Sequence, residues 1–147
     1  MSKEISTQIK INATTEQVWN VFSDFKNYPN WNPFIKSIQG DFEIGKVISI
    51  HLVLPDSKPM TFKPKVLSFE QNKKLIWLGH LMIKGIFDGE HKFELIDNKD
   101  GTCTFIQSEK FSGILVPLLR KTIEVKTVNG FNLMNKSLKE RVESMRK

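Results

Sequence analysis

The chain has 147 residues, of which 39% are hydrophobic and 26% are charged. This is the length of one domain, and it supplies enough apolar residues for a core with some space left inside it. The formal net charge of +6 invites a nucleic-acid hypothesis, but there are three arginines and the lysines are scattered. Phosphate and base contacts favour clustered arginine, so we expect solvated lysine faces with weak attraction to anionic surfaces, and no nucleic-acid partner.

The amino terminus lacks the apolar segment of a signal peptide, and no stretch approaches the length of a membrane span. Cys103 is the one cysteine. A lone cysteine excludes an intramolecular disulfide and any multi-cysteine metal site, and its simplest interpretation is a small buried residue on a strand. These features favour a cytoplasmic protein with a single domain over residues 1–147.

Residues 3–11 are expected to form a strand that leads into a short helix over residues 15–24. Thr14 can cap this helix, because Gln17 three residues later completes a capping box. The segment FKNYPNWNPF that follows contains two prolines and three asparagines, which break regular structure. Its aromatic side chains either line the mouth of a pocket or plug the end of the core: Tyr28, Trp31 and Phe34.

Alternation and turn residues predict six further strands, which form an antiparallel meander over residues 35–42, 46–54, 61–70, 74–82, 86–96 and 102–111. Residues 112–147 are predicted to form a long helix, with Pro117 tolerated near its start. Steps of three and four place one apolar stripe on this helix: Ile123, Thr127, Phe131, Met134, Leu138, Val142 and Met145. The stripe needs a sheet to pack on, so we expect seven strands curved around the helix. The small residues Thr127 and, close to it, Gly130 predict space between the helix and the sheet.

The hairpin over residues 85–113 carries polar side chains on an apolar face. Strand alternation places Phe87, Gly89, His91, Phe93 and Leu95 on one face of the first arm, and Cys103, Phe105, Gln107, Glu109 and Phe111 on one face of the second. A register that pairs Phe93 with Phe105 puts His91 opposite Gln107, with Glu109 one step along. Burying such groups unpaired costs roughly 1–3 kcal/mol each, so they predict the lining of a ligand pocket.

With these elements in order, the chain resembles the SRPBCC superfamily, also called START-like or polyketide cyclase/dehydrase-like. The residues that carry the resemblance are ATTEQVWNVFSDFKNYPNWNPF, KLIWLG, FDGEHKFEL, FIQSEKFSGILVP and GFNLMNKSLKERVE. The resemblance covers essentially the whole chain and implies an α+β helix-grip fold, with two short helices between the first two strands. It also implies a deep, largely apolar cavity for lipids, polyketides or similar molecules. It does not imply one reaction, because members include carriers, cyclases, hydroxylase subunits and chaperone-ATPase activators.

His91 is the candidate general acid or base, and Glu109 could hold its tautomer. The simpler alternative is that His91 is a cavity histidine whose hydrogen bonds are satisfied by Glu109 or Gln107, or by a ligand, and that it serves polarity and shape. The sequence contains no nucleophile elbow, phosphate loop, dinucleotide fingerprint or zinc motif. His51 and His80 are expected on the strand faces opposite the apolar residues, so we expect neither a metal site nor a cofactor.

The leading hypothesis is binding or transport of a hydrophobic small molecule in the cavity. The side chains expected to contact it are Trp31, Phe34, His91, Phe105, Gln107, Glu109, Thr127 and Phe131. One alternative is a cyclase- or dehydratase-like enzyme that uses His91 and Glu109. Another is a protein-interaction module resembling the chaperone-ATPase activators. A cavity open to solvent favours the first two hypotheses, and a filled core favours the third.

Overall fold

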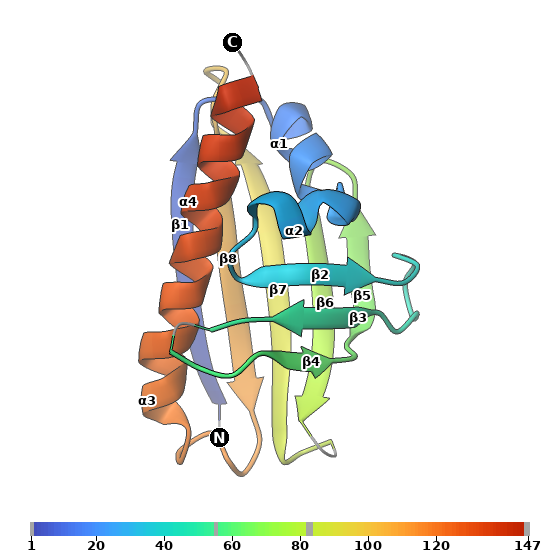
Figure 1. Cartoon of the computed structure of the whole chain (residues 1–147), viewed down its shortest axis with the longest axis vertical. Helices are drawn as coiled ribbons and strands as arrows, with labels where there is room; N and C mark the ends of the chain where they lie inside the picture. The colour runs from blue at the N-terminus through green and yellow to red at the C-terminus, as the bar shows by residue number, and fades with distance from the viewer. Residues whose placement is uncertain (1, 55, 82–83, 146–147) are drawn as a thin grey trace.

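The computed structural model describes residues 2–54, 56–81 and 84–145 (Figure 1). A five-stranded antiparallel sheet has the strand order β1-β8-β7-β6-β5, and a three-stranded sheet with the order β2-β3-β4 crosses in front of it. The strands are β1 (Ser2–Ile11), β2 (Ile35–Gln39), β3 (Ser49–Leu52), β4 (Met60–Phe62), β5 (Lys65–Glu70), β6 (Lys74–Leu81), β7 (Phe87–Asp97) and β8 (Cys103–Ser112). The long carboxy-terminal helix runs along β1. The α+β helix-grip fold expected from the sequence is confirmed.

The segment between β1 and β2 is helical, as predicted. Helix α1 (Thr15–Phe22) begins at the predicted capping box: the Gln17 amide donates to Thr14 Oγ1 at 3.2 Å, and the Thr14 amide donates to Gln17 Oε1 at 2.9 Å. A 3₁₀ turn η1 (Phe25–Asn27) and the short helix α2 (Tyr28–Trp31) follow. These helices cover one end of the five-stranded sheet.

The structure departs from the predicted strands over residues 61–70, which form β4 and β5 in two different sheets. Pro64 lies between them, and its missing N–H cannot continue a strand ladder. The described chain therefore has eight strands in two sheets, where we expected seven in one. The two sheets stay connected, because the Ile48 amide donates to the Pro64 carbonyl at 2.9 Å and Val47 forms a bridge with Lys65. The predicted strand end at residue 82 lies outside the described residues.

The carboxy-terminal helix begins at Arg120, not at Ser112 as predicted. It consists of α3 (Arg120–Thr122), a π-helical turn η2 (Ile123–Thr127) and α4 (Val128–Met145). Residues 113–119 form turns instead, since the Leu115 amide donates to the Ile86 carbonyl at 3.0 Å and Pro117 removes a helical donor. The predicted end at residue 147 lies outside the described residues.

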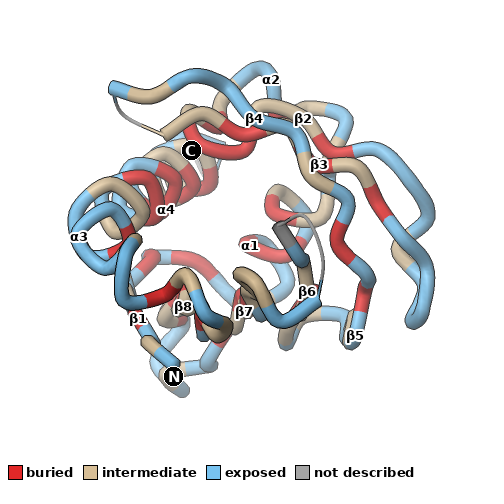
Figure 2. Tube along the Cα trace, turned by 90° about the horizontal axis from the view of Figure 1, so that it is seen from below, coloured by how far each residue is buried: buried red, intermediate tan, exposed pale blue. Residues whose placement is uncertain are grey.

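Buried positions of α4 and of the sheet face one another across the interior (Figure 2). The predicted stripe is buried or half-buried from Ile123 to Val142, whereas Met145 is 65% exposed. Under α1 the interior is filled by aromatic rings: Phe22 lies 5.1 Å from Phe93 and 5.8 Å from Phe105 between ring centroids. Toward the other end of the sheet the interior is hollow.

Candidate functional site

A cavity of about 240 Å³ lies in the hollow end, between β6–β8, the strands β3 and β4, and the first turns of the carboxy-terminal helix. Apolar side chains form most of its wall. Its lining residues are Phe34, Leu52, Leu54, Met60, Phe62, Gly79, His80, Phe87, Gly89, His91, Glu109, Phe111, Leu119, Thr122, Ile123 and Thr127. The cavity is open to solvent, so it has the form of a ligand pocket.

A pair of glycines makes room for this pocket in the sheet. Gly79 on β6 and Gly89 on β7 are direct cross-strand partners, and both line the cavity. A Cβ atom at Gly89 would overlap Oε2 of Glu109, so this glycine lets the carboxyl group lie across the strand. A Cβ atom at Gly79 would lie 3.4 Å from the ring of Phe62 on β4.

The predicted hairpin register is wrong by two residues. His91 pairs with Glu109, and Phe93 pairs with Gln107. The cause is the turn, in which the Asn98 amide donates to the Thr102 carbonyl at 3.1 Å. That bond places the turn one residue later in the chain than we expected. Because the error is an even number of residues, it leaves every side chain on its predicted face.

His91 belongs to a buried hydrogen-bond network. Gln107 Nε2 donates to Asn135 Oδ1 at 2.9 Å, so Gln107 Oε1 is the acceptor toward His91 Nε2, also at 2.9 Å. Asn135 Nδ2 donates in turn to Thr7 Oγ1 at 2.9 Å. The network connects β7, β8, α4 and β1, and it places the proton of a neutral His91 on Nε2. The free lone pair on Nδ1 then faces the pocket side.

Glu109 lies on the pocket side of His91. Its Oε1 lies 3.5 Å from His91 Nδ1, which is long for a hydrogen bond. Burial lowers the pKa of His91 to about 3, although the hydrogen bond that His91 donates to Gln107 acts in the opposite direction. Burial raises the pKa of Glu109 to about 8. Both side chains are therefore uncharged at neutral pH, and Glu109 carries a proton that it can donate.

The structure brings some of the predicted contact residues to the cavity and places others elsewhere. Phe34, His91, Glu109 and Thr127 line it. The remaining four lie outside the lining: Gln107 and Phe131 behind His91, Phe105 under α1, and Trp31 against Tyr28.

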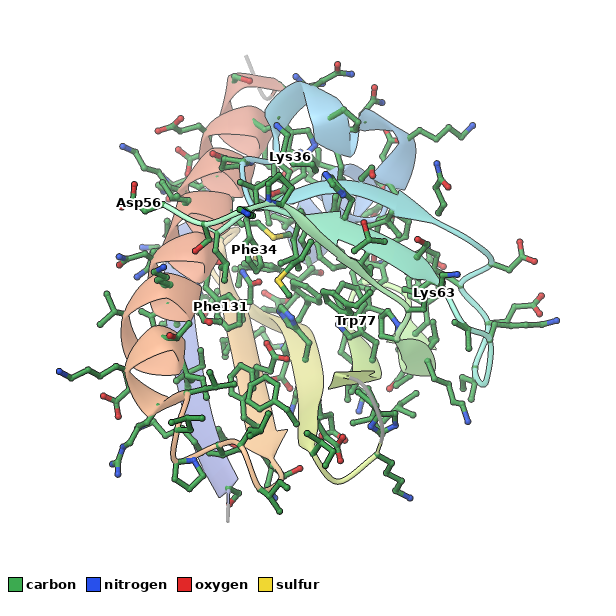
Figure 3. All side chains as sticks on the ribbon, turned by 60° about the horizontal axis from the view of Figure 1, so that its bottom comes forward. Phe34, Lys36, Asp56, Lys63, Trp77 and Phe131 are labelled. Atoms are coloured by element: carbon green, nitrogen blue, oxygen red, sulfur yellow. The ribbon has the colours of Figure 1, made fainter. Side chains whose placement is uncertain are left out.

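The sequence left open whether the aromatic residues before β2 plug the core or line the pocket, and the structure shows both. The Tyr28 ring is fully buried and its hydroxyl donates to the Phe22 carbonyl, so it plugs the core. Phe34 reaches the pocket and lies beside Phe131, with 5.6 Å between ring centroids (Figure 3). The expected space at Gly130 is wrong, because Phe34 fills it: a Cβ atom there would lie 2.8 Å from the Phe34 ring.

Sequence reasoning missed two groups of site residues. Asn135 lies beside the predicted helix stripe, four residues after Phe131 and three before Leu138, and an amide at such a spacing is a signal that could have been read. The apolar lining from β3 and β4, such as Leu52 and Phe62, carries no comparable signal, because it depends on how the second sheet folds over the first.

The other two histidines are engaged outside this network. His80 Nδ1 lies 2.7 Å from Asp88 Oδ1, and His51 Nδ1 lies 3.0 Å from Thr61 Oγ1. Within residues 2–54, 56–81 and 84–145, no three His, Cys, Asp or Glu side chains converge as metal ligands would. None of the helices in the described part of the chain is both long and apolar enough to cross a membrane.

Solved structures share this architecture at low sequence identity. The Zhui aromatase/cyclase from Streptomyces has a TM-score of 0.80 at 11% identity, over 100% of this chain and 97% of that chain. Norcoclaurine synthase from Thalictrum flavum, in complex with dopamine and hydroxybenzaldehyde, has a TM-score of 0.74 at 14% identity, over 98% and 88%. A START superfamily protein from Mycobacterium smegmatis has a TM-score of 0.73 at 17% identity, over 97% and 98%.

No curated protein matches the chain in sequence. The likenesses above establish the fold. The family described as polyketide cyclase / dehydrase and lipid transport matches residues 2–143, which is nearly the whole chain. The chain therefore belongs to the polyketide cyclase / dehydrase and lipid transport family.

Proposed function

We propose that the protein binds a hydrophobic small molecule in the pocket between the sheet and the carboxy-terminal helix. The observation that carries this proposal is the open apolar cavity with the carboxyl group of Glu109 in its wall. An empty apolar space without polar groups would be a packing defect, whereas a positioned donor gives a ligand an orientation. The lipid-transport description of the family supports the same conclusion.

The polar end of this ligand is a neutral hydrogen-bond acceptor, such as a carbonyl oxygen. Burial raises the pKa of Glu109 to about 8, so its carboxyl group can donate a proton to a ligand in the cavity at neutral pH. None of the described side chains that line the cavity belongs to a lysine or an arginine. A carboxylate placed beside Glu109 would therefore meet no lysine or arginine in the described lining, and its burial would be costly.

Thr127→Leu tests the pocket directly. Thr127 is half-buried and lines the cavity, so the larger side chain occupies ligand volume without disturbing the filled core. We expect ligand-induced thermal shifts to fall strongly in a panel of fatty acids, sterols and aromatic polyketides. Val125→Leu is the control, because Val125 lies on the same helical turn and is 58% exposed. If no compound shifts the melting temperature of the wild-type protein, the binding proposal fails.

An enzyme of the cyclase or dehydratase type is the second candidate, favoured by the same two side chains. The pKa values reverse the roles expected from the sequence, because Glu109 holds the transferable proton and His91 stays neutral. Glu109→Gln would then lower turnover roughly 100-fold or more. In a pure carrier the same change would weaken binding by about 1 kcal/mol, the usual effect of one hydrogen bond. Turnover of a bound polyketide, measured for both proteins, separates the two candidates.

The protein-interaction hypothesis has less support. A filled core would have favoured it, whereas an open cavity of about 240 Å³ lies between the sheet and the carboxy-terminal helix.

A further inference from the structure

Three large apolar side chains are exposed at the end of the molecule where the pocket lies. Ile114 is 72% exposed, Leu118 is 79% exposed and Val125 is 58% exposed. They belong to residues 113–125, the same segment that supplies Leu119, Thr122 and Ile123 to the pocket lining. The exposed residues therefore lie beside the pocket wall, on the outer side of the same turns.

Backbone hydrogen bonds fix the first residues of this segment to the rest of the fold. The Ile114 amide donates to the Gly85 carbonyl at 3.2 Å, and the Leu115 amide donates to the Ile86 carbonyl at 3.0 Å. These bonds join residues 113–115 to the turn between β6 and β7, and Figure 1 shows both loops at one end of the molecule. Val116 in the same segment is 4% exposed. The segment thus divides into a buried side that packs on the fold and an exposed apolar side.

Cationic side chains accompany the apolar ones. Lys84 precedes the Gly85 contact, and Arg120 and Lys121 begin the helix; all three are exposed. Glu124 is bonded by two cations, since its Oε1 lies 2.9 Å from Lys3 Nζ and 3.0 Å from Arg120 Nε. Asp88 is likewise engaged, by His80. The charge that this end presents to a partner is positive.

We infer that this end of the molecule docks on an anionic lipid bilayer. The docking face consists of Ile114, Leu118 and Val125 with Lys84, Arg120 and Lys121. Apolar side chains that enter the bilayer interface, beside cations that meet anionic headgroups, are the combination that binds peripheral proteins to membranes. Docking would bring the pocket wall at Leu119 to the lipid surface. The second step, passage of a poorly soluble ligand between bilayer and pocket, rests on the proposed function.

Co-flotation with vesicles tests the docking face without any ligand. The wild-type protein should float with vesicles of phosphatidylcholine mixed with phosphatidylglycerol, bind phosphatidylcholine alone more weakly, and dissociate as salt increases. The double variant Ile114→Ser, Leu118→Ser should lose about tenfold or more in apparent affinity. Ile44→Ser is the matched control, because Ile44 is 73% exposed in the turn between β2 and β3. Circular dichroism melting confirms that each variant is folded.

The outcomes distinguish this inference from the proposed function. Thr127→Leu should float like the wild type even though its pocket is filled, and the double serine variant should keep its ligand-induced thermal shift. Wild-type protein that stays unbound, or an Ile44→Ser loss as large as that of the double variant, would overturn the inference. It would also be overturned if the double variant abolished self-association of the chain while vesicle binding stayed unchanged, since the face would then join two copies.

Discussion

The two ends of the five-stranded sheet differ in the size of the residues that face the interior. Between β6 and β7 the inward pairs are large at one end, Leu75 with Phe93 and Trp77 with His91, and are two glycines at the other, Gly79 with Gly89. Phe93 lies under α1, where it packs against Phe22 and the interior is filled. The glycine pair lies in the wall of the cavity.

This change from large side chains to glycine explains why one interior is both a core and a pocket. At the closed end, Phe22 on α1 reaches into the aromatic cluster of the sheet. At the open end the strands carry no side chain at two adjacent positions, and the carboxyl group of Glu109 occupies part of the room. His91 stands at the boundary, stacked on Phe93 at 4.2 Å on one side and facing Glu109 on the other. The sheet therefore packs a filled core at one end and lines the cavity at the other.

The largest expected effect is a contrast between two phenylalanines. Phe22→Ala should lower the free energy of unfolding by about 3–5 kcal/mol, because the ring is 1% exposed and the cavity left behind cannot refill. Phe87→Ala removes the same atoms from the pocket wall, where the ring is half-buried and stacked on Phe111, and should cost about 1 kcal/mol. Urea unfolding measures both values. Equal losses would mean that the open end is packed as densely as the closed end.

The sequence predicted this division only in part. Alternation was sufficient to place His91, Gln107 and Glu109 on the inner face, because the side-chain period of a strand does not depend on its partners. The pairing of His91 with Glu109 was not predictable in this way, since it depends on where the turn closes. Nor was the start of the helix, which is displaced to Arg120 by backbone bonds to a distant loop.

The cavity itself was predicted for a reason that the structure only half supports. Thr127 does face open space, but Gly130 is a contact point for Phe34, and the glycines that do create room are on the sheet. A small residue can mark either a void or a close approach, and the sequence alone does not distinguish the two. The distinction depends on which side chain comes from the other layer.

The next effect concerns pH, and it arises at the boundary between the two ends. Folding raises the pKa of Glu109 from 4.5 to about 8, so the folded state binds more protons over that range and stability falls as pH rises. Folding lowers the pKa of His91 from 6.5 to about 3, so stability falls as pH decreases through that range. Between pH 4.5 and 6.5 the effects of the two groups on the free energy of unfolding oppose each other. Stability should therefore be greatest there and decline on both sides.

Above pH 6.5 only Glu109 still makes the stability depend on pH. The free energy of unfolding should fall by about 1–2 kcal/mol between pH 6.5 and 8. Glu109→Gln should remove this alkaline decline and keep the acidic one. Glu90→Gln, at an exposed position of the same hairpin, is the control and should keep both. Denaturant titrations across the range provide the measurement. If stability still declines at alkaline pH in Glu109→Gln, another titrating group causes the decline.

The smallest expected effect on stability tests the glycine pair. A Cβ atom at Gly89 overlaps the Glu109 carboxyl group, but that group ends a flexible side chain and can move into the pocket. Gly89→Ala should therefore cost about 1 kcal/mol or less, while it carries the carboxyl group away from His91 and toward solvent. Its pKa should then fall toward 4.5, and the alkaline decline of stability should weaken. Gly79→Ala, whose Cβ would meet Phe62 at 3.4 Å, should preserve the pH profile. If both variants keep the wild-type profile, Gly89 does not position Glu109, and the open end owes its shape to the second sheet alone.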